Sequence, residues 1–83
     1  MSQKENLLER FLQFPSDFRY QELKTLLGNY GYKETNGSGS RVKFVHEETR
    51  GVISLHKPHP GNIVKQYLLK QVAQKLKEDG YIE

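Results

Sequence analysis

Two short runs of alternating apolar and polar residues constrain this 83-residue chain more than any other feature. They cover Arg41–His46 and Gly51–His56, both rich in β-branched or aromatic residues, and the charged residues 47–50 separate them. Short alternating runs on either side of a turn are typical of an antiparallel hairpin. We therefore expect the chain to build its core against one face of a small sheet.

The register of this hairpin follows from the positions of its apolar residues. Val42 and Phe44 share one face of the first run. Ile53 and Leu55 share one face of the second, and pairing through a four-residue turn brings the two apolar faces together. The predicted cross-strand pairs are Val42 with Leu55, Phe44 with Ile53, Val45 with Val52, Lys43 with Ser54, and Arg41 with His56. One face of the hairpin is therefore apolar and the other is basic.

Two helices are predicted before the hairpin, because apolar residues recur there at intervals of three and four. The first lies within residues 1–15 and ends before the proline, which disfavours helical geometry in the residue preceding it. The second begins near Arg19 or Tyr20 and ends at Gly31, a residue suited to left-handed helix termination. A short edge strand over Tyr32–Thr35 follows.

The clearest helical pattern follows the segment HKPHPGN at residues 56–62. This third helix is predicted to begin at Gly61 or Asn62 and to end at Asp79–Gly80. The free amide groups at its start are expected to form an anion site beside His59. The order helix, helix, three strands, helix predicts an α+β fold, with a small three-stranded antiparallel sheet and the helices packed on one face. The predicted core is Leu23, Leu26, Leu27, Val42, Phe44, Ile53, Leu55, Leu68 and Val72.

Length and composition exclude several classes of protein. A chain of this length is expected to form one small domain over residues 1–83, without room for a separate cofactor domain. There is no cysteine for a disulfide or a thiolate zinc site, and the three histidines lack the spacing of metal ligands. No apolar run is long enough to span a bilayer, and the first residues do not resemble a secretory signal. We expect a cytoplasmic protein with no metal, no small-molecule cofactor and no membrane partner.

The net charge of +3 is concentrated in the middle of the chain. Residues 33–71 hold seven basic residues and three acidic ones, whereas the flanking segments are close to neutral. This balance suits a phosphate-rich partner such as nucleic acid. An ordinary solvated face of a small basic domain would carry the same charges, and both interpretations stay open. The exposed sheet face is predicted to carry Lys33, Arg41, Lys43, Ser54 and His56.

A set of short motifs, taken in order, resembles the HicA toxins of bacterial toxin-antitoxin pairs. These are G-S-x-x-x-F on a strand, then an apolar strand leading into H-P-G and a closing helix. The matching residues are Gly39, Ser40, Phe44, His59, Pro60 and Gly61, with LLKQV inside the final helix. The resemblance covers about residues 19–77 and leaves residues 1–15 as an N-terminal helical extension. It implies the fold of the double-stranded-RNA-binding domain, ribosome-independent cleavage of messenger RNA, and neutralisation by a HicB-like antitoxin.

One position departs from the pattern of the family that the chain resembles. The usual catalytic histidine of that family directly follows the Gly-Ser pair, and here that position is Arg41. Arginine stays protonated and cannot transfer a proton, although it can bind phosphate and stabilise charge that develops on it. The predicted register sets His56 across from Arg41, so its imidazole is the candidate for proton transfer. His46, at the far end of the hairpin, is the weakest candidate.

Three functional hypotheses follow. In the first, the chain is an RNA-directed toxin that cleaves messenger RNA as a metal-independent endoribonuclease, with His56 and Arg41 as catalytic residues. In the second, it binds RNA without cleaving it, because the histidine is replaced. In the third, the basic face docks an acidic protein partner. The predicted RNA-binding residues are Lys33, Gly39, Ser40, Arg41, Lys43, Lys57 and His59, and a HicB-like antitoxin is the protein partner implied by the resemblance.

Overall fold

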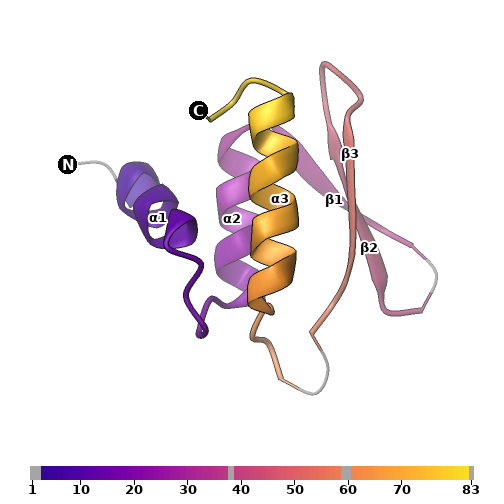
Figure 1. The fold of residues 1–83 in the computed structure, drawn as a ribbon. Coiled ribbons are helices and arrows are strands. Elements are labelled where there is room, and N and C mark those ends of the chain that lie inside the picture. Colours follow the sequence, from indigo (N-terminus) through magenta and orange to yellow (C-terminus); the bar gives the residue numbers. More distant parts are fainter. Residues whose placement is uncertain (1–2, 38, 59–60, 83) are drawn as a thin grey trace.

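Three helices and one antiparallel sheet make up the protein, seen in a computed structural model that describes residues 3–37, 39–58 and 61–82. The elements are α1 (Gln3–Leu12), α2 (Tyr20–Asn29), β1 (Tyr32–Asn36), β2 (Arg41–His46), β3 (Val52–His56) and α3 (Gln66–Glu78). This is the predicted α+β order, α-α-β-β-β-α. Helices α2 and α3 lie side by side over one face of the sheet, and α1 lies on the side of the helical layer away from the sheet (Figure 1).

The sheet has the strand order β1-β2-β3, with both pairs antiparallel. The register of β2 and β3 is the predicted one in all five pairs, from Arg41 with His56 to Val45 with Val52. Because side chains alternate along a strand, this register fixes which of them meet the helices. The edge strand β1 is one residue longer than predicted, and β3 begins one residue later, at Val52.

The core lies between the inner face of the sheet and the helices. Val42, Phe44, Ile53 and Leu55 are all buried there, and truncating Phe44 to alanine is expected to cost about 3 to 5 kcal/mol of stability. One predicted core residue is wrong, because Leu68 is only half-buried at the margin of the core. The buried apolar residues that were not predicted are Phe11, Phe18, Tyr32, Val64, Leu69, Ala73 and Leu76.

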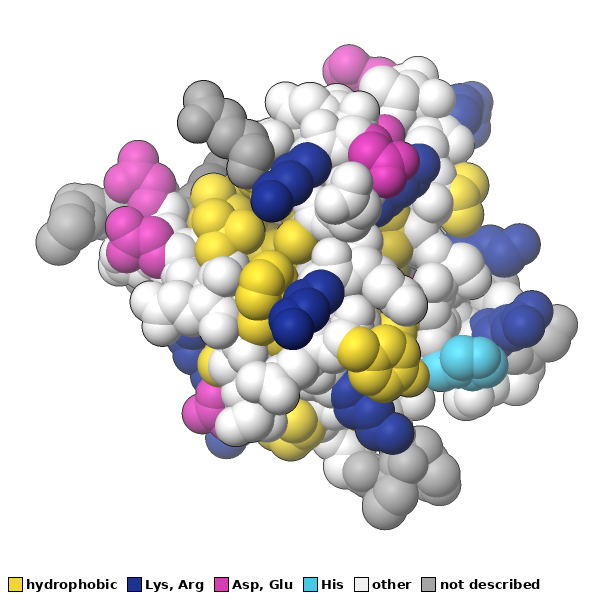
Figure 2. All heavy atoms as spheres, viewed as in Figure 1, with side chains coloured by type: hydrophobic (Ala, Val, Ile, Leu, Met, Phe, Trp, Pro, Cys, Tyr) yellow, Lys and Arg dark blue, Asp and Glu magenta, His cyan; other side chains and the backbone are white. Residues whose placement is uncertain are grey.

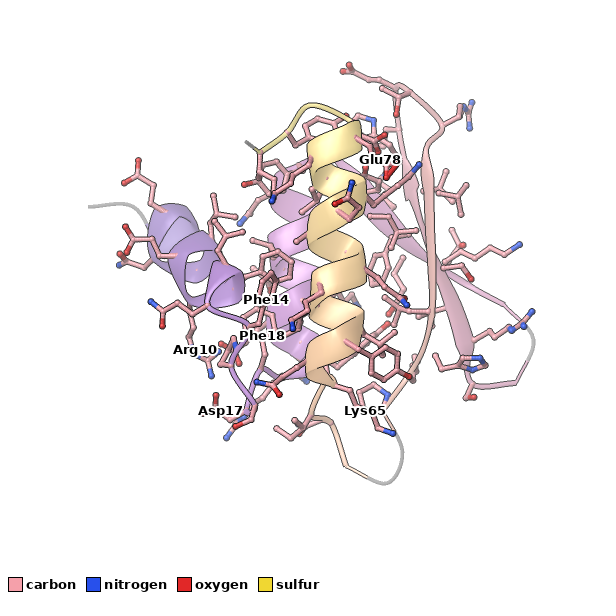
Figure 3. The ribbon with its side chains drawn as sticks, viewed as in Figure 1. Arg10, Phe14, Asp17, Phe18, Lys65 and Glu78 are labelled. Atoms are coloured by element: carbon pink, nitrogen blue, oxygen red, sulfur yellow. The ribbon has the colours of Figure 1, made fainter. Side chains whose placement is uncertain are left out.

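Helix α1 is attached to the rest of the protein by aromatic packing and an ion-pair cluster. Phe11 and Phe18 are fully buried with ring centroids 5.7 Å apart. The guanidinium group of Arg10 binds the carboxylate of Glu22 on α2 and lies 2.9 Å from that of Asp17. Figure 3 shows Arg10 and Asp17 together at the end of α1, with Phe18 between them and the helical layer. The N-terminal segment therefore contributes to the same apolar core as the sheet.

The start of α3 differs from the prediction. The helix begins at Gln66, and the residues before it are extended, with Ile63 forming an antiparallel bridge with Arg19. The amide of Tyr20 donates to the carbonyl of Asn62 at 2.7 Å, and the amide of Val64 donates to the carbonyl of Phe18 at 2.7 Å. This pairing holds residues 62–64 out of the helix. The predicted helix start at Gly61 or Asn62 is therefore wrong, and the predicted anion site beside His59 involves a residue outside the described ones.

Candidate functional site

The outer face of the sheet points away from α2 and α3 and is formed by alternate residues of the three strands. Inner positions of β2 and β3 are buried, whereas the outer ones are exposed or half-buried. The outer residues are Lys33, Thr35, Arg41, Lys43, Val45, Val52, Ser54 and His56. None of these strand residues is acidic, so the face formed by the strands is positively charged.

Arg41 and His56 are direct cross-strand neighbours on this face. The amide of Lys57 donates to the carbonyl of Ser40 at 2.8 Å, which places Arg41 and His56 in a pair without backbone hydrogen bonds between its members. In such pairs the Cα atoms are only about 4.5 Å apart and the side chains come close. A permanently charged guanidinium group and an imidazole therefore share one exposed patch.

Lys43 extends this patch along β2. It lies two residues from Arg41 on the same face, opposite Ser54 on β3. Both side chains are exposed to solvent. We call Arg41, Lys43, Ser54 and His56 the basic patch. Its chemistry is suited to binding phosphate through the two cations and to transferring a proton through the imidazole.

The turn before β2 supports the patch through its glycines. A Cβ atom on Gly37 would lie 3.1 Å from both the Cβ and the carbonyl oxygen of Arg41. The amide of Gly37 donates a hydrogen bond to that carbonyl at 3.0 Å. The backbone of Gly37 therefore packs directly against Arg41 and closes the turn. Gly39 has φ of +60°, and Ser40 beside it is exposed. Both predicted turn residues therefore lie directly beside the patch.

Lys33 lies on the outer face but not in the basic patch. It pairs with Val45, four residues along β2 from Arg41, which is a distance of about 13 Å at the usual rise of a strand. Its ammonium group lies 2.6 Å from the carboxylate of Glu47, and that hydrogen bond raises the pKa of Lys33. The structure therefore separates Lys33 from the residues with which it was predicted to act.

Lys57 is exposed but belongs to a different cluster. Its Nζ lies 5.8 Å from the ring centroid of Tyr20, at the start of α2. The hydroxyl of Tyr20 donates to Glu34, and this hydrogen bond lowers the pKa of the Glu34 carboxyl, helped by the charges of Lys24 and Lys57. Burial and the same hydrogen bond raise the pKa of Tyr20 above its ordinary value. Lys57 thus lies toward the helices, beside the end of the basic patch.

His46 has a structural environment. Its side chain is only 5% exposed, and its Nδ1 accepts hydrogen bonds from the amides of Glu48 at 3.0 Å and Thr49 at 3.2 Å. The ring stacks on Tyr81 and meets the edge of Tyr32, at centroid distances of 5.2 and 5.1 Å. Because Nδ1 is an acceptor, the ring hydrogen is assigned to Nε2. The alternation along β2 already indicates this inward position, since His46 shares the face of Val42 and Phe44.

Sequence reasoning missed an exposed aromatic residue next to His56. Tyr67, at the start of α3, is 56% exposed, and with His56 it lines a hollow of about 190 Å³ between the end of β3 and the helix. The signal was present in the sequence, because Tyr67 lies off the apolar stripe that Leu69, Val72 and Leu76 form along α3. What the sequence did not show is that the end of β3 passes beside it.

Across residues 3–37, 39–58 and 61–82, no three histidine or acidic side chains come together as a group able to hold a metal ion. None of the helices formed by these residues has the length and apolar character needed to cross a membrane.

A family model described as HicA toxin of bacterial toxin-antitoxin matches residues 20–80. The matched segment begins with α2, contains the whole sheet and α3, and leaves α1 outside. No curated protein and no solved structure matches the chain significantly.

Proposed function

The chain belongs to the HicA family of bacterial toxins, and we propose that it binds messenger RNA through the basic patch and cleaves it as a metal-independent endoribonuclease. One observation carries this proposal. Arg41 and His56 are cross-strand neighbours on an exposed face whose strand residues include no carboxylate. A phosphate group at this position would meet the fixed positive charge of Arg41 and an imidazole that can accept or donate a proton.

Cleavage would use the RNA's own 2'-hydroxyl as the nucleophile. His56 removes the proton from this hydroxyl, and the oxygen attacks the adjacent phosphorus atom. The guanidinium of Arg41 holds the phosphate oxygens and stabilises the negative charge that develops on them. The bond from phosphorus to the 5'-oxygen of the next nucleotide breaks, and that oxygen takes a proton from water. The products are a 2',3'-cyclic phosphate and a 5'-hydroxyl, with no metal ion required at any step.

The other predicted RNA-binding residues would act around this centre. Lys43 neutralises a neighbouring phosphate, and the turn at Gly39–Ser40 lets the backbone approach the RNA. Lys57 and Lys33 contribute from the two ends of the sheet, Lys33 less strongly because Glu47 already neutralises it. Since HicA toxins are paired with HicB antitoxins, we also propose a HicB-like protein as the partner.

A second candidate function is RNA binding without catalysis. It is favoured by Arg41, which occupies the position where HicA toxins usually have their catalytic histidine. Arginine retains phosphate binding and loses proton transfer. In this case His56 would only add a hydrogen bond to the bound phosphate.

The two candidates are separated by incubating the purified protein with end-labelled single-stranded RNA in EDTA. The first predicts cleavage that survives EDTA and yields 2',3'-cyclic phosphate ends. The second predicts salt-sensitive binding of intact RNA, together with cleavage by Arg41→His. A protein that neither binds nor cleaves RNA would contradict both and would leave the docking of an acidic partner protein as the role of the patch.

A further inference from the structure

The most exposed large apolar side chain in the described part of the protein lies beside the basic patch. Four such side chains are more than two-fifths exposed, and Tyr67 exceeds the other three at 56%. Tyr67 is the second residue of α3, where its ring is directed to solvent while Leu69 and Val72 face the core. An aromatic ring in this position contributes little to the core, which raises the question of what it contacts.

Tyr67 lines two hollows, and lysine side chains line both of them as well. The smaller, of about 190 Å³, is also lined by His56, Lys57 and Lys65. The larger, of about 560 Å³, is also lined by Lys65 and Lys70. Figure 2 shows the exposed histidine in cyan with an aromatic side chain in yellow and dark-blue cations next to it. The positive charge of the basic patch therefore continues past the ring onto α3.

Cations that alternate with an exposed aromatic ring form the type of surface that binds single-stranded nucleic acid. The cations follow the phosphates, and the ring stacks on a base. A base paired within a duplex has no free face for such stacking, whereas an unpaired base does. The ring of Tyr67 and the imidazole of His56 share one hollow, so a base on the ring would belong to a nucleotide next to the one at the basic patch.

We propose that Tyr67 is the stacking platform for an unpaired RNA base, that Lys65 and Lys70 bind the phosphates beyond it, and that the substrate is therefore single-stranded RNA. This inference rests on the proposed function and adds to it the strandedness of the substrate and the direction in which the strand leaves the basic patch. Tyr67 would be a binding and positioning residue, because it does not touch the reacting phosphate.

The test uses the full chain, a labelled single-stranded oligoribonucleotide and the same sequence as a duplex, with binding followed by fluorescence anisotropy. Tyr67→Ala is expected to weaken single-strand binding by roughly 5- to 100-fold, the usual loss for one stacked base, and to leave duplex binding unchanged. Tyr67→Phe keeps the ring and should bind as the wild type does. Leu12→Ala, which removes an exposed apolar side chain from α1, is the matched surface control.

Salt dependence separates stacking from charge. Tyr67→Ala should keep the wild-type salt slope of the binding constant, whereas Lys65→Ala should lower it. An oligonucleotide with one abasic position adds a test in which the RNA is changed and the protein is not, so protein folding is unaffected. The wild type should bind the strand less tightly than the intact one when the abasic position is that of the stacked base. Tyr67→Ala should bind the two strands equally.

Each outcome gives a separate decision. If the wild type binds no RNA, the proposed function is wrong and this inference is wrong with it. If the wild type binds and cleaves RNA while Tyr67→Ala equals it on single strands, the proposed function stands and the stacking role is overturned. Equal losses on single-stranded and duplex RNA would also overturn it, because stacking on an unpaired base cannot produce them.

Discussion

His46 ends β2 and His56 ends β3, so one hairpin places a histidine at its turn and another at its open end. At the turn, His46 is buried against Tyr32 and Tyr81, and its Nδ1 accepts hydrogen bonds from two backbone amides of the turn. At the open end, His56 is exposed and stands across from Arg41. The same residue type therefore has two environments on one hairpin.

The difference comes from alternation along the strands. His46 lies on the inner face with Val42 and Phe44, whereas His56 follows the inward Leu55 and lies on the outer face. A shift of one residue would exchange these faces. The register, more than the residue type, therefore decides which histidine can meet a ligand.

The largest effect is expected at the open end. His56→Ala should reduce RNA cleavage by roughly 10² to 10⁴-fold, because general acid-base catalysis contributes about that much. RNA affinity and stability should change little, since His56 is an exposed surface residue. Cleavage rates with end-labelled RNA, combined with anisotropy and urea unfolding, measure all three quantities. Undiminished cleavage by His56→Ala would end its assignment as the proton-transfer group.

The opposite result is expected at the turn. His46→Ala should lower the free energy of unfolding by about 2 to 4 kcal/mol, because it leaves a cavity between two tyrosines and two amides without an acceptor. His46→Phe keeps an aromatic ring between the tyrosines and loses the two ring nitrogens, so it should cost less than His46→Ala. Urea unfolding gives both values. If His46→Ala were as stable as wild type but failed to cleave RNA, the contrast between the two histidines would be wrong.

An intermediate effect is expected at Arg41. Arg41→Ala should weaken RNA binding by roughly 10- to 100-fold, the loss expected for a hydrogen-bonded charge, and should lower cleavage as well. Arg41→Lys keeps the charge but not the planar fork of donors, so it should recover part of the affinity and less of the cleavage. Anisotropy and single-turnover cleavage on the same samples separate the two effects. Full activity in Arg41→Lys would indicate that charge alone is needed there.

The register and the basic patch could be predicted from the sequence, because side-chain alternation in a strand has a strict period of two. The apolar residues at 42, 44, 53 and 55, together with a four-residue turn, predicted the pairing that sets Arg41 across from His56. The environment of His46 followed less directly. The alternation indicated its inward direction, but Tyr81 reaches it from beyond α3, a contact that local patterns do not show.

The start of α3 was mispredicted for a related reason. Val64 fits the helical spacing of Leu68 and later residues, so propensity and period both favoured a helix from Gly61 or Asn62. In the fold, residues 62–64 pair with the segment from Phe18 to Tyr20, and these tertiary hydrogen bonds override the local preference. Tyr67 and His56 are far apart in the sequence and meet only in the tertiary fold, so their shared hollow could not be predicted from local patterns.

The smallest effect sharpens the comparison between the two ends of the outer face. Lys43→Ala should lower the salt slope of single-strand binding by about 0.7, because one phosphate contact and its released counterion are lost. Lys33→Ala should change the slope less, since Lys33 is hydrogen-bonded to Glu47 at the turn end and is already neutralised. Glu47→Gln is the matched control: it frees the ammonium group of Lys33, so it should raise RNA affinity slightly and give Lys33→Ala a larger effect in the double variant. Anisotropy over a salt series measures these slopes. Equal losses for Lys33→Ala and Lys43→Ala would show that the RNA covers the whole outer face, and would contradict a site confined to its open end.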